Sequence, residues 1–263
     1  MLIPELCGGL GNNLFQISSA LSLAKTYNQE FGILQIPQSP HSNLDYNTTI
    51  FSKFQQYINK YHIDMIIDEK NLFPIQMSLI ETNPDKNILL RGYYQNYTYI
   101  EPHRQEIIDL FDLESDADAN TNTKINEDSY FLHIRRGDFV GNAFHYINLD
   151  QYYQNALKTI NDQPKNIGSL CKVISNDIQW CEDYKQLQDI RVQFIGHEID
   201  ELQTLSLMKS CSLGGIAANS SFSWWGLYLN ISRPYLIIPS TFFPHNILYQ
   251  QGYYFPQATV CEI

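Results

Sequence analysis

Apolar and polar positions along the first part of the chain predict strands and helices in turn. The apolar stretch LIPEL is followed by GGLGNN and then by LFQISSALSLAKTY, in which apolar residues recur every three or four positions. This order predicts a strand, a glycine turn and a helix, which is how many α/β nucleotide-binding domains begin. Further strands are predicted at residues 62–69 and 87–95, and a helix at residues 103–113.

A polar stretch then divides the chain. Residues 112–129 read DLESDADANTNTKINEDS, which is acidic and offers almost nothing to bury. Such a composition predicts a linker rather than part of a core. We therefore expect an N-terminal domain over residues 1–115, a linker over 116–128 and a C-terminal domain over 129–263.

The second part alternates between strand and helix patterns. Helices are predicted at residues 150–161, 177–187 and 200–211, between strands at 130–136, 169–177, 191–196 and 235–240. Alternation at these lengths predicts a parallel sheet covered on both faces. Two such domains would form a bilobal α/β protein with a cleft, and open α/β sheets bind ligands at the carboxyl ends of their strands.

Composition and charge narrow the classes of function. The 263 residues carry a formal net charge of −11, and such a field repels polyanions such as nucleic acid or an anionic membrane. Any phosphate ligand must therefore be held by a local basic cluster. The first residues lack the features of a signal peptide, and no apolar run is long enough to span a membrane, so we expect a cytoplasmic protein.

Neither the cysteines nor the acidic residues predict a metal site. The five cysteines are widely spread, without a CxxC pair or a Cys/His cluster at zinc spacing, so we expect free and mostly buried thiols. The acidic DADA stretch lies in the predicted linker, and no Ser/His/Asp or HExxH pattern is evident. We expect neither a metal ion nor a bound cofactor.

The glycine turn near the start is the first candidate ligand contact. GGLGNN lacks the lysine and hydroxyl residue of a P-loop, and it lacks the spacing of the GxGxxG dinucleotide motif. Glycines before a helix can still cradle an anion or let the backbone approach a ligand. The alternative is a tight turn that needs glycine only for its conformation.

Residues 131–139, FLHIRRGDF, concentrate charge where a predicted strand ends. Strand alternation places His133 and Arg135 on one face and Arg136 on the other. One arginine can then face a ligand while its neighbour pairs with a carboxylate, for which Asp138 is a candidate. A guanidinium group matches phosphate geometry and keeps its charge, which suits a pyrophosphate. The alternative is a surface cluster of salt bridges.

Two more polar stretches follow predicted strands. Asn176 and Asp177 come directly after VIS and can cap the next helix, while Asp177 can also accept a hydrogen bond from a ligand. The stretch NSSFSWWG, residues 219–226, combines short polar side chains at a helix start, which favour phosphate, with flat aromatic rings, which favour sugars or bases. The alternative is a capped helix in which Trp224 and Trp225 are a buried anchor.

Taken together, three of these stretches resemble one family. GGLGN-LF, HIRRGD and NSSFSWWG occur in the order typical of the α-1,2-fucosyltransferases of glycosyltransferase family 11, and RGYYQNYTYI, ISNDIQWC and IPSTFF resemble weaker motifs of that family. The resemblance implies a GT-B-like fold: two Rossmann-type lobes with parallel sheets and an inter-lobe cleft, the acceptor on the N-terminal side and the GDP-sugar on the C-terminal lobe. It also implies transfer from GDP-fucose to a galactose-terminated glycan, with inversion and without a metal.

The resemblance also assigns roles to residues. Arg135 resembles the arginine that neutralises the donor pyrophosphate, Asn12 is the second expected catalytic residue, and Arg136 is expected to be structural. Without a metal, guanidinium groups and helix ends must stabilise the charge that grows on the leaving phosphate. The expected donor-binding residues are Gly9, Gly11, His133, Asp138, Asp177, Asn219, Ser220, Ser221 and Phe222.

Departures from the family pattern leave rival hypotheses open. Asn13 stands where the family commonly has glutamine, and Asn176 replaces one aspartate of a pair, which bears on the acceptor more than on the donor. One rival is a transferase of the same fold with another GDP-sugar or linkage. Another is a non-catalytic protein that binds glycans or nucleotides, against which the intact HIRRGD argues. A lipid-linked acceptor would bring the protein to a membrane surface.

Overall fold

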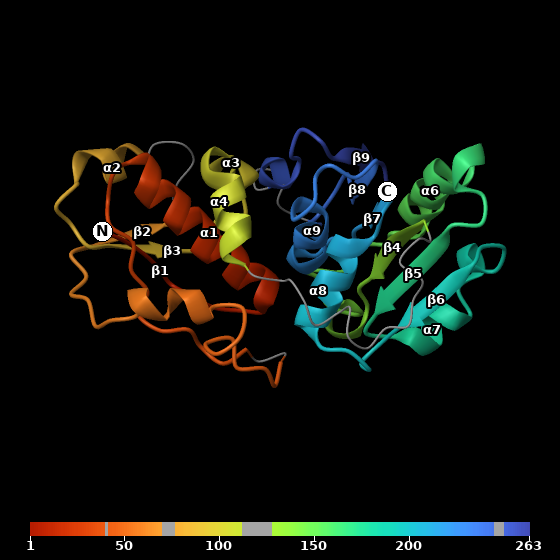
Figure 1. Cartoon of the computed structure of the whole chain (residues 1–263), viewed down its shortest axis with the longest axis horizontal. Coiled ribbons are helices and arrows are strands. Elements are labelled where there is room, and N and C mark those ends of the chain that lie inside the picture. Colours follow the sequence, from red (N-terminus) through yellow and green to blue (C-terminus); the bar gives the residue numbers. More distant parts are fainter. Residues whose placement is uncertain (40–41, 70–76, 112–127, 245–249) are drawn as a thin grey trace. The chain divides into compact units, whose positions relative to one another are not determined.

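The structure is a computed structural model that describes residues 1–39, 42–69, 77–111, 128–244 and 250–263. The chain divides into two compact units, Met1–Asp112 and Leu113–Ile263, which Figure 1 colours red to yellow and green to blue. The predicted linker lies outside the described residues, apart from Asp128. None of the described helices is both long enough and apolar enough to cross a membrane.

The first unit is built on a parallel sheet in the order β1-β3-β2. Its strands are β1 (Leu2–Pro4), β2 (Met65–Asp68) and β3 (Ile88–Arg91). Its helices are α1 (Leu10–Thr26), α2 (Met77–Thr82), α3 (Tyr97–Ile100) and α4 (Arg104–Leu110), with 3-10 turns at Ser52–Tyr57 and Glu101–His103. Helix α1 packs against β1 and α3.

Helix α1 begins one turn earlier than its apolar pattern predicts. We expected it to start at Leu14, but Gly9 is its N-cap and the residues of GNN already belong to its first turn. The first N–H groups of a helix have no partner within the helix, so poor helix formers are tolerated there. Gly8 has φ +80°, a conformation that favours glycine, and it turns the chain into the helix.

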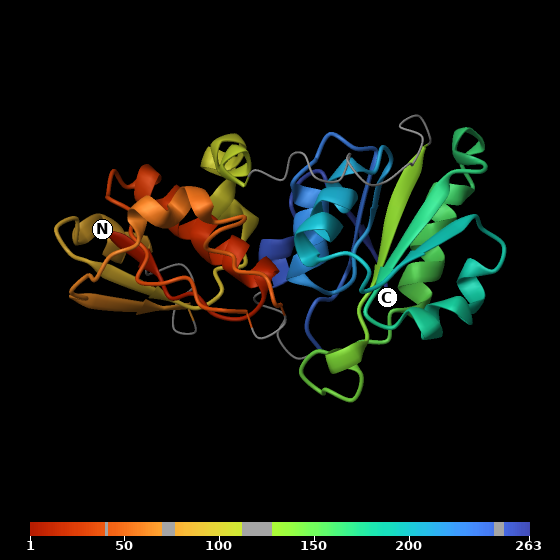
Figure 2. The same cartoon turned by 60° about the horizontal axis from the view of Figure 1, so that its bottom comes forward.

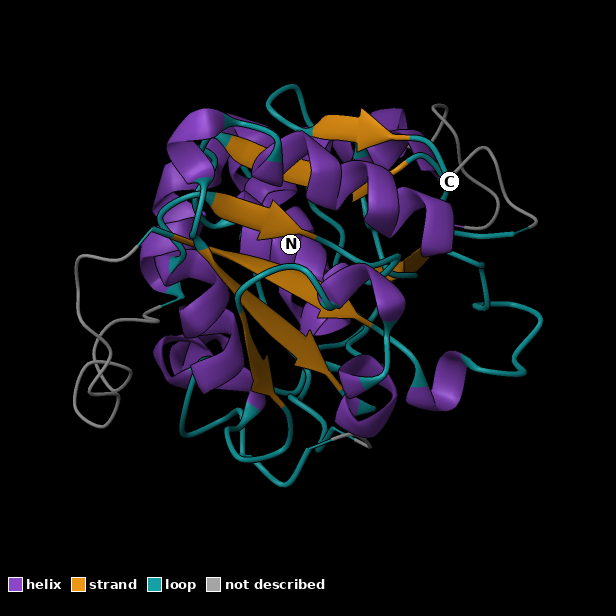
Figure 3. Ribbon diagram, turned by 90° about the vertical axis from the view of Figure 1, so that its right-hand side faces the viewer, coloured by secondary structure: helices purple, strands orange, loops and turns teal. Residues whose placement is uncertain are grey.

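The second unit contains a six-stranded parallel sheet in the order β6-β5-β4-β7-β8-β9 (Figure 3). Its strands are β4 (Ser129–Ile134), β5 (Leu170–Ser175), β6 (Val192–Ile195), β7 (Gly214–Ile216), β8 (Tyr235–Pro239) and β9 (Thr259–Cys261). Its helices are α6 (Asp150–Asn161), α7 (Ile178–Glu182), α8 (Glu201–Ser210) and α9 (Ser221–Tyr228). Helices α6 and α7 cover one face of the sheet, and α8 and α9 cover the other (Figure 2).

Strand β4 lies at the centre of this sheet and is buried along its whole length. The chain passes from β4 to β5 and β6 on one side, and then returns to place β7 on the other side of β4. The strand order therefore reverses between β4 and β7, and such a switch point is where open α/β sheets bind ligands.

The two tryptophans of α9 belong to the core. Trp224 and Trp225 are fully buried, and the indole Nε1 of Trp224 donates to the carbonyl of Tyr253 at 2.8 Å. Trp224 stacks on Tyr228, with ring centroids 4.4 Å apart. The interpretation of this pair as a buried anchor is therefore correct, and neither ring is available as a platform for sugar.

The predicted fold class, an α/β protein with parallel sheets in two Rossmann-type lobes, is confirmed. Helix α7 ends at Glu182 and is shorter than predicted. Just beyond its end, the ring of Tyr184 stacks on Trp180, with ring centroids 4.5 Å apart. Strand β9 was missed because it is short and largely exposed, and only its pairing with β8 defines it.

Candidate functional site

The candidate site of the second unit lies at the carboxyl edge of its sheet. Strands β4, β5 and β7 end at Ile134, Ser175 and Ile216, and a polar stretch singled out from the sequence begins within three residues of each end. Since the three strands are neighbours, their carboxyl ends meet on both sides of the switch point. The fold thus brings together the predicted residues of the C-terminal lobe.

Arg135 is the first residue beyond β4 and forms an ion pair with Asp138. The distance from its Nη2 to Asp138 Oδ1 is 2.6 Å, and the two side chains are 27% and 50% exposed. Its guanidinium also lies 5.2 Å from the ring centroid of Phe139. An ion pair this exposed contributes at most about 1 kcal/mol, so a phosphate group can displace the Asp138 carboxylate.

Arg136 points toward β5 and is held by different partners. Its Nε donates to Asp177 Oδ2 at 2.9 Å, its guanidinium lies 3.9 Å from the ring centroid of Trp180, and its backbone N–H donates to Asn176 Oδ1 at 2.9 Å. We expected one arginine to pair with a carboxylate, but both do. The contacts of Arg136 fit the structural role that the resemblance implies for it.

Asp177 caps helix α7 as one of the two sequence interpretations predicts. Its Oδ1 accepts from the backbone N–H of Trp180 at 3.3 Å, while its other oxygen accepts from Arg136. Asn176 keeps a hydrogen bond that an aspartate could also make, because the amide oxygen accepts the Arg136 N–H. The replacement of a carboxylate at position 176 therefore leaves this link between the β4 and β5 ends intact.

His133, the fifth residue of β4, is a buried imidazole beside α9. It is 5% exposed, its ring centroid lies 6.1 Å from that of Phe222, and its Nδ1 has no hydrogen-bond partner among the described residues. Burial and then the nearby Arg135 charge lower its pKa to about 3. His133 is thus neutral near pH 7 and is suited to a hydrogen bond with an uncharged group, not to carrying positive charge.

The stretch after β7 combines one anchored residue with the start of α9. Asn219 is 7% exposed, and its Nδ2 donates to the carbonyls of His145 at 2.9 Å and Phe242 at 3.2 Å, which pins the loop. Ser220 is the N-cap of α9 and Ser221 is its first residue, both half-buried. The backbone N–H groups at such a helix start favour a negatively charged ligand.

The glycine turn lies at the carboxyl edge of the other sheet, in the first unit. Gly9 precedes α1, and Gly11 and Asn12 belong to its first turn. Asn12 Oδ1 accepts a hydrogen bond from Gln95 Nε2 at 2.8 Å. The predicted site residues therefore form two groups, one at the carboxyl edge of each sheet.

Gln95 and Trp180 were missed as members of these two groups. Both stand inside stretches quoted for the resemblance, GYYQ and SNDIQW, so the signal was present, but the contact partners lie far away in sequence. Within the described part of the chain, no group of three or more His, Cys, Asp or Glu side chains could hold a metal ion.

Comparison with known proteins finds a matching family and several similar proteins. The profile of Glycosyl transferase family 11 matches residues 5–257. An alpha-1,2-colitosyltransferase of Escherichia coli is 28% identical over 286 aligned positions, which cover 94% of each chain. The O-antigen biosynthesis glycosyltransferase WbnK of the same species is 25% identical and covers 92% of this chain and 94% of its own.

Among solved structures, a glycosyl transferase family 9 protein from Veillonella parvula aligns with a TM-score of 0.49 and 11% sequence identity. The alignment covers 99% of this chain and 86% of that one.

Proposed function

The chain belongs to glycosyltransferase family 11, and we propose that it is a metal-independent galactoside α-1,2-fucosyltransferase. It would transfer L-fucose from GDP-fucose, with inversion, to the 2-hydroxyl of a terminal galactoside. Family membership makes the protein a glycosyltransferase, and the motifs HIRRGD and NSSFSWWG, which resemble those of α-1,2-fucosyltransferases, support the donor.

Arg135 is the observation that carries the proposal. It stands at the switch point, on the carboxyl end of the central strand, with a partly exposed guanidinium whose partner is an exposed carboxylate. Its neighbour Arg136 is held by Asp177 and stacked on Trp180, so Arg135 is the arginine suited to a new anionic partner. Exchange of Asp138 for the donor pyrophosphate would keep the charge of Arg135 balanced throughout.

The proposed chemistry is a single displacement at the anomeric carbon of the donor sugar. Negative charge grows on the leaving GDP while the sugar gains positive, oxocarbenium-like character. The Arg135 guanidinium and the N–H groups at the start of α9 would stabilise that negative charge. Neutral His133 would hydrogen-bond an uncharged part of the donor, and Asn12 remains the second residue proposed as catalytic.

Colitose is a second candidate donor sugar, because a relative aligned over 94% of this chain is named an alpha-1,2-colitosyltransferase. Colitose lacks the 3-hydroxyl of fucose and otherwise has the same skeleton. A site that hydrogen-bonds the 3-hydroxyl rejects the sugar that lacks it by a factor of about 10⁴ or more, whereas a site without that partner accepts both. The ratio of kcat/KM for the two GDP-sugars therefore separates the candidates.

The test is release of GDP from GDP-fucose, with and without lactose or N-acetyllactosamine and in the presence of EDTA. Arg135→Ala should abolish acceptor-stimulated release. Arg191→Ala is the matched control, since Arg191 is exposed and precedes β6, at the opposite edge of the same sheet. Loss of wild-type turnover in EDTA would refute metal independence. Turnover with GDP-colitose but not with GDP-fucose would show that colitose, not fucose, is the donor sugar.

A further inference from the structure

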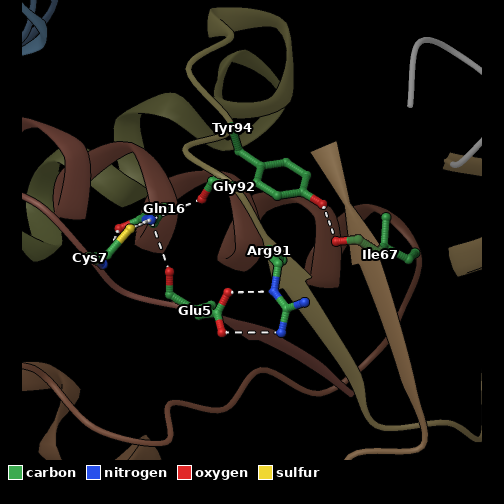
Figure 4. A network of polar contacts seen from close by, with 7 residues as sticks. All are labelled: Glu5, Cys7, Gln16, Ile67, Arg91, Gly92 and Tyr94. Atoms are coloured by element: carbon green, nitrogen blue, oxygen red, sulfur yellow. Dashed lines mark hydrogen bonds and ion pairs between the residues drawn. The ribbon is translucent and has the colours of Figure 1, made fainter. Parts of the chain in front are cut away.

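A buried amide joins two segments at the carboxyl edge of the first sheet (Figure 4). Gln16 is 1% exposed on α1, and its Nε2 donates to the carbonyls of Glu5 and Gly92, each at 2.9 Å. Its Oε1 accepts from the backbone N–H of Cys7 at 3.1 Å. One side chain thereby bonds the backbone that leaves β1 and the backbone that leaves β3.

Gln16 links the two backbones directly beyond the end of the hydrogen-bonded ladder between β1 and β3. The strands pair as far as Pro4 opposite Leu90, and the N–H of Glu5 then donates to the carbonyl of Leu90 at 3.0 Å. Beyond this bond no strand pairing continues, and the Gln16 amide spans the space between the two backbones. The length and orientation of this buried side chain therefore constrain the distance between the two segments.

Asn13 strengthens the same arrangement. Its Nδ2 donates to the carbonyl of Cys7 at 2.9 Å and to Gln16 Oε1 at 3.2 Å. Cys7 is thus bonded through both its N–H and its carbonyl. The short asparagine at position 13 is matched to Gln16 within this buried pair, which gives its departure from the family pattern a local physical role.

The segment after β3 is fixed from its other side as well. The half-buried Glu69 carboxylate, directly after β2, accepts from the N–H groups of Tyr93 and Tyr94 at 2.8 and 2.9 Å. Tyr94 in turn donates its hydroxyl to the carbonyl of Ile67 at 3.0 Å (Figure 4). Between Gln16 on one side and Glu69 on the other, the backbone from Gly92 to Tyr94 has a defined position.

The groups held in this way are the ones that meet at the surface. Asn12 lies one helical turn before Gln16 and contacts Gln95, which follows the held segment. Next to them, Arg91 and Glu5 form an exposed ion pair at 2.9 Å, and Tyr93 is 44% exposed. The edge thus presents amide, charged and aromatic groups over a buried amide framework.

We propose that Gln16 is a positioning residue that sets the spacing between the glycine turn and residues 92–95, and through it the contact of Asn12 with Gln95. Its kinetic consequence rests on the function proposed above, whereas its structural consequence does not. A displacement of about 1 Å at a reacting group costs about 100-fold in rate, so a loosened turn should lower kcat.

The test compares Gln16→Met, which keeps the length of the side chain and removes the amide, with Gln29→Met. Gln29 is a matched control because its amide donates to the carbonyl of Ile80 at 2.8 Å and accepts from the N-terminal amine, at the opposite edge of the same sheet. Both variants should lower the melting temperature. Gln16→Met alone should speed hydrogen exchange in peptides spanning residues 5–13 and 88–96.

The kinetic readout is the division between kcat and KM. Gln16→Met should lower kcat at least about tenfold and change the KM for the GDP-sugar less than about threefold, since all the predicted donor-binding residues except Gly9 and Gly11 lie on the second unit. Gln16→Glu should be partly rescued at low pH. A protonated glutamic acid can donate to one of the two carbonyls, whereas the ionised form can donate to neither.

Two results would overturn the inference. One is unchanged hydrogen exchange of both peptides in Gln16→Met, and the other is a kcat equal to that of Gln29→Met at a similar loss of stability. If wild-type protein transferred no sugar from any GDP-sugar, the proposed function would fail, and the exchange experiment would still decide whether Gln16 holds the two segments.

Discussion

Gly137 makes the turn that carries Arg135 sensitive to a single added methyl group. Its φ is +35°, in the left-handed region that favours glycine, and a Cβ built there collides with the side-chain amide of Asn176. That amide accepts the N–H of Arg136 at 2.9 Å and links the ends of β4 and β5. Gly137→Ala therefore combines backbone strain with displacement of Asn176.

The two contributions can be estimated separately. A side chain at positive φ costs about 1 kcal/mol. Displacement of Asn176 loses the hydrogen bond to Arg136, which adds about 1 kcal/mol. Gly168 supplies the strain alone, since its φ is +85° and a Cβ there meets no atom within 4 Å. We expect Gly137→Ala to cost about 2 kcal/mol and Gly168→Ala about 1 kcal/mol of unfolding free energy.

Urea unfolding of both variants measures this difference. A double variant, Gly137→Ala with Asn176→Ala, isolates the collision, because the added methyl group then has no amide to displace. The sum of the two single costs should exceed the cost of the double variant by about 1 kcal/mol. Equal destabilisation by Gly137→Ala and Gly168→Ala, with strict additivity in the cycle, would refute the account of this turn.

Three other predictions concern the second unit. The pKa of His133 is about 3 in the folded protein, below its ordinary value, so the unfolded chain binds more protons between pH 3 and 6.5 and stability falls as the pH drops through that window. His133→Phe should remove up to about 1.4 kcal/mol per pH unit of that slope in urea unfolding, and parallel slopes would contradict this. Arg136→Lys should cost about 1 kcal/mol of unfolding free energy, because lysine keeps the charge but loses both the Nε bond to Asp177 and the contact of the guanidinium with the Trp180 ring. An unchanged urea midpoint would contradict this. Asn219→Ala should cost about 2 kcal/mol of unfolding free energy by leaving the carbonyls of His145 and Phe242 without their donor, and unchanged stability would show that the loop is held by other contacts.

Much of the fold could be predicted from the sequence because most of its strands and helices have a recognisable local pattern of apolar residues. The bounds of α6 match the predicted residues 150–161, since a helical apolar face extends over its whole length. Strand β4 is buried along its length, and residues 130–134 are apolar or aromatic apart from His133. The start of α1 was misplaced because the glycine and asparagines of its first turn look like a loop when only apolar spacing is followed.

The contacts of the site were less predictable because they join residues far apart in the chain. Arg136 and Asp177 are 41 residues apart, and Gln16 reaches Gly92 across 76 residues. Alternation along the strand predicted over residues 130–136 indicates that the two arginines face different ways, but it does not say which carboxylate each contacts. Those partners follow from the strand order, which places β5 beside β4.

The linkage formed from GDP-fucose and lactose is the measurement that tests the central claim most directly. Proton NMR of the purified trisaccharide reports both the anomeric configuration of the new fucose and the carbon of galactose that bears it. We expect an α-linked fucose on carbon 2 of galactose, because inversion converts the β-linked donor. A β-linked product, or attachment at another hydroxyl, would contradict it.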